Sequence, residues 1–395
     1  TGGLFPSPYE NVTFVAEPVS NLVHADVLKE NGASFIASRL FEKKEFLAST
    51  DAWFRPVNMY VGPDGALYVL DYYRQIIEHP EWMADDVGKS DAVYNGVDQG
   101  RIYRITPKGT ATIDWSSKLK LGDESSETLI TYLSNPNSWW RQNAQRLLID
   151  RNDKSVIPLL EKLAVQTDDA LGSLHALWTL HGLSALTADV LTAGLRNPSA
   201  GVRENAVRMA EDLFLIQPNA DTERITAELI RLKNDPSGKV RYQVLASLGF
   251  VNTPAAIQAR KELLFQNLDN NWMQIAALSA LPVENDQLLT EVLQKYNPAN
   301  PGYASLVERL SYMAGASGDI AQLKSLIGKA LARENSSKNW NVALLRGITQ
   351  SLRNRGVDGN ALATEREQLL TAAMDYPQPA MRRAAVDLLR IVSLP

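Results

Sequence analysis

The sequence contains no cysteine, only four histidines and no long apolar run. Each of thiol catalysis, disulfide bonding, thiolate zinc sites and covalent haem attachment needs cysteine, so all four are excluded. The histidines His24, His79, His175 and His181 are too few for an evident metal cluster. Apolar stretches such as residues 275–281 fall far short of the roughly 20 residues that cross a bilayer. We therefore expect no haem motif, no metal site and no transmembrane segment.

The sequence also lacks a large excess of either charge: it has 40 lysines and arginines and 45 acidic residues, and its net charge is −5. A nucleic-acid surface needs a basic patch that neutralises phosphates, so we expect no nucleic-acid partner. The 395 residues, 45% of them hydrophobic, suffice for more than one domain with a large core. The sequence begins Thr-Gly-Gly-Leu, which predicts that residue 1 is an internal point of a longer polypeptide or a processed end.

Short apolar runs separated by glycine, proline, asparagine and aspartate dominate the sequence before about residue 115. Such runs predict short β-strands, which are typical of a sandwich, a barrel or a propeller. The Gly-Pro-Asp-Gly sequence of residues 62–65 joins two runs as a hairpin requires, because proline presets φ and glycine accepts positive φ. The predicted strands cover residues 12–16, 21–26, 34–40, 56–61, 66–71 and 101–106.

After about residue 122 the apolar positions recur with a helical period, and a longer repeat appears. Each clear copy has a helix end, an Asn-, Asp- or Tyr-Pro turn, and a new helix that opens with an apolar residue and arginine. One helical pair cannot bury its apolar stripe alone, whereas a stack of pairs can. We predict a mostly α-helical fold: an α-solenoid of about seven HEAT-like pairs over residues 122–395, behind a β domain of residues 1–115. The clearest copies begin at Leu133, Leu195, Leu232 and Met374.

One part of the β domain resembles a known family. Residues 51–74 read Asp-Ala-Trp-Phe-Arg-Pro-Val-Asn-Met-Tyr-Val-Gly-Pro-Asp-Gly-Ala-Leu-Tyr-Val-Leu-Asp-Tyr-Tyr-Arg. Together with residues 14–26, 77–80 and 98–104, they resemble the end of a family of membrane-bound dehydrogenases. Those are propeller proteins related to the soluble glucose and sorbosone dehydrogenases that use pyrroloquinoline quinone, and helical repeats after the propeller fit the same family.

The resemblance implies that residues 1–115 are the C-terminal blades of a β-propeller. Because only about two blades' worth of strands is present, the remaining blades would lie upstream in the gene, on another chain, or have been lost. It also implies pyrroloquinoline quinone and calcium as cofactors, a cytochrome c domain as a partner, and a periplasmic or cell-envelope location. The sequence itself carries no haem motif.

Three residues would carry the chemistry that the resemblance implies. Arg55 would bind the cofactor carboxylates, since its planar charged fork suits bidentate binding; the alternative is a structural arginine held by Asp51 or Asp71. His24, near Asp26, would be the general base of sugar oxidation, or else a hydrogen-bonding residue between blades. Asp71 would line the channel or bind calcium, or else hold the side chain of Arg55 or Arg74.

The other polar candidates favour structural roles. Asp64 is expected to set turn geometry, and Glu78 with His79 could belong to a channel-side loop. Arg101 and Arg104 are expected to be structural. His175 and His181 are six residues apart and do not share a helix face as i, i+4 zinc ligands would.

Two further residue types recur in the helical repeats. Recurrent arginines predict a charge ladder between neighbouring repeats, at Arg141, Arg203, Arg241 and Arg382. Recurrent tryptophans are expected in the core, and any exposed one would mark a partner surface. These are Trp139, Trp140, Trp178, Trp272 and Trp340.

Three hypotheses about function follow. The first is the C-terminal part of a quinoprotein-like sugar or alcohol dehydrogenase, whose HEAT repeats dock partners or an electron-transfer domain. The second is a non-catalytic protein-interaction scaffold, because solenoids expose long concave surfaces. The third is a carbohydrate-binding propeller without redox activity.

Overall fold

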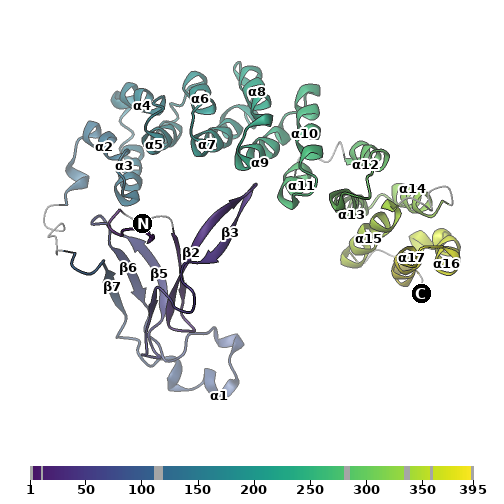
Figure 1. Cartoon of the computed structure of the whole chain (residues 1–395), viewed down its shortest axis with the longest axis horizontal. Coiled ribbons are helices and arrows are strands. Elements are labelled where there is room, and N and C mark those ends of the chain that lie inside the picture. The colour runs from purple at the N-terminus through teal and green to yellow at the C-terminus, as the bar shows by residue number, and fades with distance from the viewer. Residues whose placement is uncertain are drawn as a thin grey trace. The chain divides into compact units, whose positions relative to one another are not determined.

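The structure is a computed structural model of the chain, and it describes residues 3–9, 12–110, 119–279, 285–332, 339–355 and 359–392. The chain divides into two compact units. The first comprises Thr1–Glu228 with Ser237–Val240, and the second comprises Leu229–Pro236 with Arg241–Pro395. All strands and the first helices belong to the first unit (Figure 1).

The described strands form two antiparallel sheets within the first unit. The first sheet has the order β1-β2-β3 with β4 also paired to β2, and the second has the order β5-β6-β7. All six predicted strands are present. The short β4 was not predicted, because two residues carry no alternation. The bounds are β1 Val12–Glu17, β2 Leu22–Asn31, β3 Ser34–Arg39, β4 Leu47–Ala48, β5 Pro56–Val61, β6 Leu67–Asp71 and β7 Arg101–Ile105.

The hairpin between β5 and β6 turns where the sequence predicts it. The amide of Gly65 donates to the carbonyl of Gly62 at 2.9 Å, and the amide of Gly62 donates to the carbonyl of Ala66 at 2.9 Å. Gly65 has φ of +78°, which a residue with a Cβ rarely adopts. A Cβ on Gly62 would lie 2.3 Å from the Tyr68 ring. Both glycines are therefore required by this turn.

A small apolar core joins the two sheets. It consists of Phe5, Val23, Phe54, Leu67 and Val69, each at most 5% exposed. Strand β6 alternates buried and half-buried residues, as a strand with one face on a core does. The strands thus make a small antiparallel β region, and the interpretation of its two sheets as propeller blades stays a prediction.

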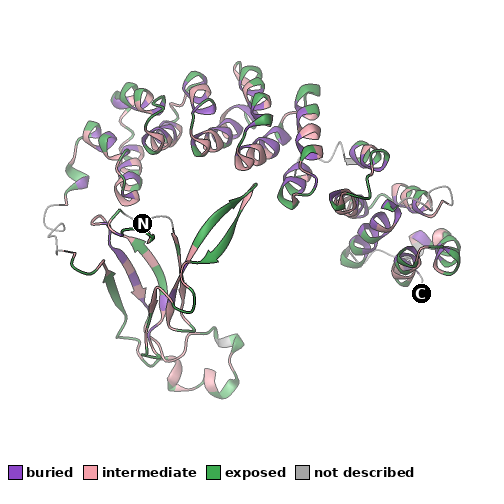
Figure 2. Cartoon of the chain, viewed as in Figure 1, coloured by how far each residue is buried: buried purple, intermediate pink, exposed green. Residues whose placement is uncertain are grey.

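The helical part follows as consecutive helix pairs, as predicted. In the first unit α2 packs on α3, α4 on α5 and α6 on α7, while α3, α5 and α7 also contact one another in sequence. Buried, intermediate and exposed residues occur together along each of these helices, as expected of helices with one face in a core (Figure 2). The bounds are α2 Ser126–Tyr132, α3 Ser138–Arg151, α4 Ile157–Ala164, α5 Ala170–Gly182, α6 Ala188–Leu195 and α7 Ala200–Ala210.

The second unit repeats this arrangement. Here α10 packs on α11, α12 on α13, α14 on α15 and α16 on α17, and the second helices α11, α13, α15 and α17 contact one another in sequence. This stacking defines a solenoid within each unit. The bounds are α10 Pro254–Gln266, α11 Asn271–Leu278, α12 Asn285–Gln294, α13 Pro301–Ser317, α14 Ile320–Leu331, α15 Trp340–Arg355, α16 Arg366–Asp375 and α17 Pro379–Val392.

Shorter elements and two further helices complete the described chain. Helices α8 and α9 include the residues at which the two units divide. Among the described residues, no helix is long and apolar enough to cross a membrane. The remaining bounds are α1 Asp85–Gly88, α8 Thr222–Arg231, α9 Gly238–Ser247, η2 Pro80–Trp82, η3 Asp91–Val93, η5 Leu121–Asp123, η6 Lys154–Val156, η7 Glu211–Leu215, η8 Leu232–Asn234, η9 Leu248–Phe250 and η12 Gly359–Glu365.

The recurrent arginines share a contact inside each repeat, and the predicted ladder between neighbouring repeats stays a prediction. In each copy the Nη1 atom donates to the carbonyls six and five residues earlier, at the turn before the helix. These carbonyls follow a helix end and lack helical donors. The donors are Arg141, Arg203, Arg241 and Arg382. Gln274 fills the same role toward the carbonyl of Leu268, at 2.6 Å.

The tryptophans divide between core and surface. Trp340 is 4% exposed, as predicted for a core residue. Trp272, on α11, is 50% exposed, so the prediction of a core position is wrong there. Trp178 is half-buried and donates its indole N–H to Asn205 Oδ1 at 3.0 Å. An exposed tryptophan on the second helix of a pair gives that helix an apolar group at its surface.

Candidate functional site

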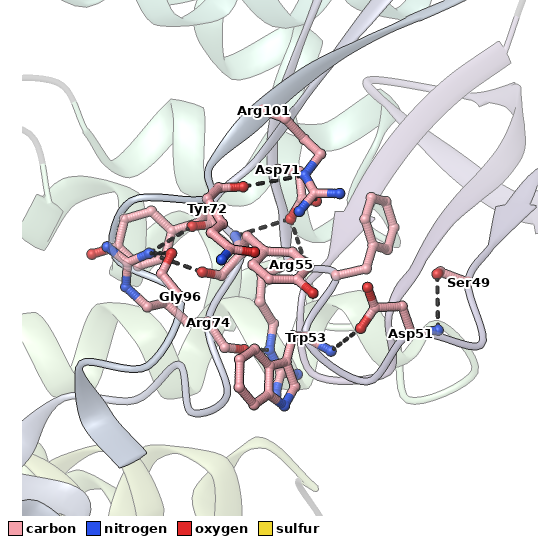
Figure 3. A network of polar contacts seen from close by, with 12 residues as sticks. Ser49, Asp51, Trp53, Arg55, Asp71, Tyr72, Arg74, Gly96 and Arg101 are labelled. Carbon is pink, nitrogen blue, oxygen red and sulfur yellow. Dashed lines mark hydrogen bonds and ion pairs between the residues drawn. The ribbon is translucent and has the colours of Figure 1, made fainter. Parts of the chain in front are cut away.

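Arg55 is the centre of a polar network at the start of β5 (Figure 3). Its Nε donates to the carbonyl of Arg74 at 3.0 Å and its Nη2 to that of Gln75 at 2.7 Å. Its Nη1 donates to the carbonyls of Pro18 at 2.8 Å and Val19 at 3.3 Å. The guanidinium therefore ties the β1–β2 turn to the segment after β6. The predicted structural alternative, in which Asp51 or Asp71 holds the Arg55 side chain, is wrong, because the side chain donates to backbone carbonyls.

Asp71 ends β6 with its side chain fully buried. Its Oδ1 accepts hydrogen bonds from the amides of Arg55 at 2.8 Å and Tyr73 at 2.9 Å. Its Oδ2 has no hydrogen-bond partner among the described residues and lies 3.8 Å from Arg101 Nε. Asp71 therefore holds the backbone of Arg55, and the charged side chain beside it belongs to Arg101. The predicted alternative, a bond to the side chain of Arg55 or Arg74, is wrong.

Arg74 organises the loop that follows β6. Its Nη1 donates to the carbonyls of Tyr73 at 2.8 Å and Gly96 at 2.7 Å, and its guanidinium lies 4.3 Å from the centre of the Tyr72 ring. Tyr73 adopts a left-handed φ of +49° and Gly96 a φ of +94°. A Cβ on Gly96 would lie 2.6 Å from the carbonyl oxygen of Tyr73, so glycine is needed there. Two arginines thus fix this loop through backbone carbonyls (Figure 3).

His24 lies on β2 between two carboxylates. Its Nδ1 is 2.5 Å from Glu45 Oε2 and its Nε2 is 3.0 Å from Asp26 Oδ1. The other oxygen of Glu45 pairs with Arg39. The hydrogen bond to Glu45, followed by the one to Asp26, raises the pKa of His24 above its ordinary 6.5. The hydrogen bond from His24 lowers the pKa of Glu45 below its ordinary 4.5. The geometry suits an imidazolium that donates from both nitrogens.

These three residues do not fit the cofactor chemistry that the resemblance implies. Arg55 has committed its guanidinium to four carbonyls, which leaves no fork for the carboxylates of a quinone. His24 engages both ring nitrogens and favours the protonated form, so it has no free nitrogen to accept a proton. Asp71 is buried, and the described residues contain no group of three acidic or histidine side chains that could hold a metal ion.

The His24 contacts predict a defined pH dependence of stability. The folded-state pKa of His24 is raised. Its contribution to the free energy of unfolding is therefore fully present below pH 6.5 and is lost as the pH rises through the folded-state pKa. Because the pKa of Glu45 is lowered, its contribution is present above pH 4.5 and is lost as the pH falls through the folded-state value. The free energy of unfolding of the β region should be highest between these two values.

A variant series separates the His24 contribution. In urea unfolding measured across this pH range, His24→Gln should remove most of the decline in unfolding free energy above pH 6.5. The matched control is His79→Gln, which replaces a histidine whose side chain is 63% exposed and should keep the decline. An unchanged slope in His24→Gln would show that the two carboxylates do not couple to folding through this ring.

The remaining β-region candidates have structural contacts. Arg104 donates from Nε to Asp64 Oδ2 at 2.7 Å, and Tyr68 donates its hydroxyl to the same oxygen at 3.3 Å. Asp64 also accepts the amide of Ala66 at 3.2 Å, so it serves turn geometry as predicted. His79 is exposed on the loop after β6, and its amide donates to the side chain of Glu78 at 2.8 Å.

The β5–β6 turn docks on the first helical pair, which the sequence did not indicate. Asn137 Nδ2 donates to the carbonyls of Gly62 at 2.9 Å and Pro63 at 3.2 Å, and the indole N–H of Trp140 donates to Pro63 at 2.9 Å. Asn137 is 5% exposed and also caps α3 by accepting the amide of Trp139 at 2.9 Å. The β region and the helical repeats of the first unit are therefore joined by specific hydrogen bonds.

The comparisons with known proteins identify a domain and no function. Residues 1–109 match the family described as a domain of unknown function, DUF7133. No curated protein matches the chain. Among solved structures, the designed armadillo repeat protein YIII(Dq)4CqI is 15% identical, with 68% of this chain and 100% of that chain covered and a TM-score of 0.19. A likeness at that score carries no argument, and the solenoid rests on the helix packing described above.

A second candidate site lies in the second unit, on the second helices of three successive pairs. A groove of about 850 Å³ runs over α11, α13 and α15 and is called the α13 groove below. Ile275 contributes from α11 and Arg309 from α13, while Arg346 contributes from α15. Its lining is mostly apolar and neutral with a few charged side chains, as is typical of a surface that holds a ligand in one orientation.

Proposed function

We propose that this chain is a protein-binding scaffold whose α13 groove holds a partner protein. The observation that carries the proposal is the groove itself, about 850 Å³ on the aligned second helices of three repeats. Stacked helical pairs form extended surfaces of this kind, and proteins built from them use such surfaces for binding. The polar groups of the β region that resemble a catalytic set are each engaged in internal contacts, which favours a structural role for that region.

The side chains at the groove support a protein partner over a small polar ligand. Trp272 on α11 is 50% exposed, and Ile275, one turn further on, is 39% exposed. Exposed aromatic and aliphatic groups beside arginines are the composition that dominates the energetics of protein interfaces. Gln350 on α15 lines the groove and is exposed, so a probe placed there would report on occupancy.

Site-specific photo-crosslinking tests the scaffold proposal. A benzophenone amino acid at Gln350, in the full chain expressed in its source cells, should yield a covalent adduct with another protein on irradiation. The control position is Gln294 on α12, which is exposed on the first helix of a pair. An adduct at Gln350 that is weak or missing at Gln294 supports the proposal. No protein adduct at Gln350, or equal adducts at both positions, rejects it.

The second candidate function is a quinoprotein-like sugar or alcohol dehydrogenase, as the resemblance of residues 51–74 implies. The observation that favours it is the β5–β6 hairpin around the Gly-Pro-Asp-Gly turn, in the strand positions that the family pattern implies. In this proposal the β region is the end of a propeller in the cell envelope, and a cytochrome c domain accepts its electrons. Catalytic residues would then come from blades outside this sequence.

Dye reduction separates the two functions. The protein is supplied with pyrroloquinoline quinone and calcium and assayed with glucose and other sugars in the presence of an artificial electron acceptor. The scaffold proposal expects no reduction above a sample without quinone. Sugar-dependent reduction that needs both added quinone and calcium would favour the dehydrogenase.

A further inference from the structure

The α13 groove contains two arginines that form no ion pair with another described residue of its lining. Arg309 on α13 is half-buried, and its Nη2 donates to Asn271 Oδ1, a neutral acceptor, at 2.7 Å. Its Nε is buried and has no hydrogen-bond partner among the described residues. Buried donors in folded proteins are nearly always satisfied, and a charged donor left unpaired is costly. Because Nε is buried, a ligand in the groove meets the terminal nitrogens of the Arg309 guanidinium, whose acceptor Asn271 is neutral.

Arg346 supplies a second positive charge on the neighbouring helix. It is exposed on α15, and no hydrogen bond or ion pair joins it to another described residue. Gln350 follows it by four residues, so both side chains lie on the same face of the helix. Glu308 is the one acidic side chain in the groove lining, so two arginines and one glutamate give a local charge of +1. The whole chain, by contrast, carries −5.

The remaining lining is apolar or neutral. Ile275 and Leu278 contribute from α11, Met313 from α13 and Val342 from α15. Trp272 lies one turn before Ile275 and is 50% exposed. An apolar side chain of a ligand would bury area against this strip, while a carboxylate would pair with the arginines beside it.

The dimensions of the groove suit an extended peptide. Packed helices lie roughly 8–10 Å apart, so three neighbouring helices span about 20 Å. An extended chain advances about 3.3 Å per residue, so about six residues would cross all three helices. Successive side chains of an extended segment point to opposite sides, which lets alternate ones enter the groove.

We propose that the α13 groove binds an extended peptide segment in which an acidic side chain lies next to apolar ones. The acidic group pairs with Arg346 and with the guanidinium of Arg309, and the apolar group contacts Ile275, beside which Trp272 lies exposed. This inference rests on the proposed scaffold function and names the chemistry of its partner. Glu308 disfavours a second acidic group at its own position.

Selection from a library of random linear peptides displayed on phage tests the inference on the full chain. Enriched peptides should contain aspartate or glutamate two residues away from an apolar or aromatic residue, since alternate side chains enter the groove. Synthesised with a fluorophore, they should bind with an affinity that falls as salt rises, since the pairing is electrostatic. Arg346→Gln should raise the dissociation constant about tenfold, because it removes a charge-assisted contact while leaving an exposed position polar.

The matched control is Arg383→Gln, which removes an exposed arginine of α17 outside the groove lining and should leave the affinity unchanged. Arg309→Gln should weaken binding as well, with circular dichroism as the check on its fold. Enrichment of peptides without acidic residues, no enrichment over a blank surface, or equal binding to Arg346→Gln would overturn the inference. A Gln350 adduct whose yield is unchanged in Arg346→Gln would reject the acidic peptide and leave the scaffold standing, whereas a missing adduct rejects the scaffold itself.

Discussion

Replacing Arg55 with methionine is expected to lower the free energy of unfolding of the β region by about 3 kcal/mol. Four backbone carbonyls from two segments would lose a charged donor, and a methionine offers none. Arg55 is only partly buried, so solvent compensates some of the loss. The β1–β2 turn and the segment after β6 should then exchange their amide hydrogens faster, because Arg55 is what joins them.

Hydrogen–deuterium exchange and urea unfolding together measure this effect. The control is Arg39→Met, which removes an arginine whose side chain is 45% exposed and pairs with one carboxylate, so its cost should stay below about 1 kcal/mol. The stability loss in Arg55→Lys should lie between those of Arg55→Met and Arg39→Met. A lysine keeps the charge, but its ammonium cannot reach all the acceptors that are arranged around a planar guanidinium. A stable Arg55→Met variant with unchanged exchange near residues 18–19 and 74–75 would refute the structural role.

The role of Arg55 shows where prediction from the sequence stops. An arginine before a strand, followed sixteen residues later by an aspartate, suggests a charge pair, because residue types are all that a sequence displays. Its actual acceptors are carbonyl oxygens of Pro18, Val19, Arg74 and Gln75, and every residue carries a carbonyl. No residue-type signal can therefore identify them. The proposed catalytic set was built on the same kind of signal.

The fold itself was more predictable, because its determinants are local. Alternation and the Gly-Pro-Asp-Gly turn placed β5 and β6 within one residue of their observed bounds. The Asn-Pro and Asp-Pro turns marked the ends of successive helices, and the arginine of each copy bonds to carbonyls only six and five residues earlier. Gln274 also donates to a carbonyl six residues earlier. The sequence pattern did not include it, because the pattern was defined by arginine and glutamine is a neutral donor.

Truncating Asn137 to alanine should destabilise the first unit by about 3 kcal/mol, a loss made of two different terms. One term is the cap of α3, because Asn137 Oδ1 accepts the amide of Trp139. The other term is the docking of the β5–β6 turn, because Nδ2 donates to the carbonyls of Gly62 and Pro63 in a buried position. Carbonyls that are buried and left without a donor cost more than the lost bond alone.

The matched control isolates the docking term within the same unit. Thr187 caps α6 by accepting the amide of Val190, with no bond to the β region, so Thr187→Ala should cost about 1 kcal/mol, the worth of a cap alone. The difference in stability loss between Asn137→Ala and Thr187→Ala then measures how much the docked β5–β6 turn contributes. The amides of Gly62 and Gly65 should exchange faster only in Asn137→Ala. Equal costs for the two variants would mean that the turn contributes no stability through Asn137. In that case Trp140, whose indole N–H also donates to Pro63, would be the contact that joins the β region to the helical repeats, and Trp140→Phe should then carry the larger loss.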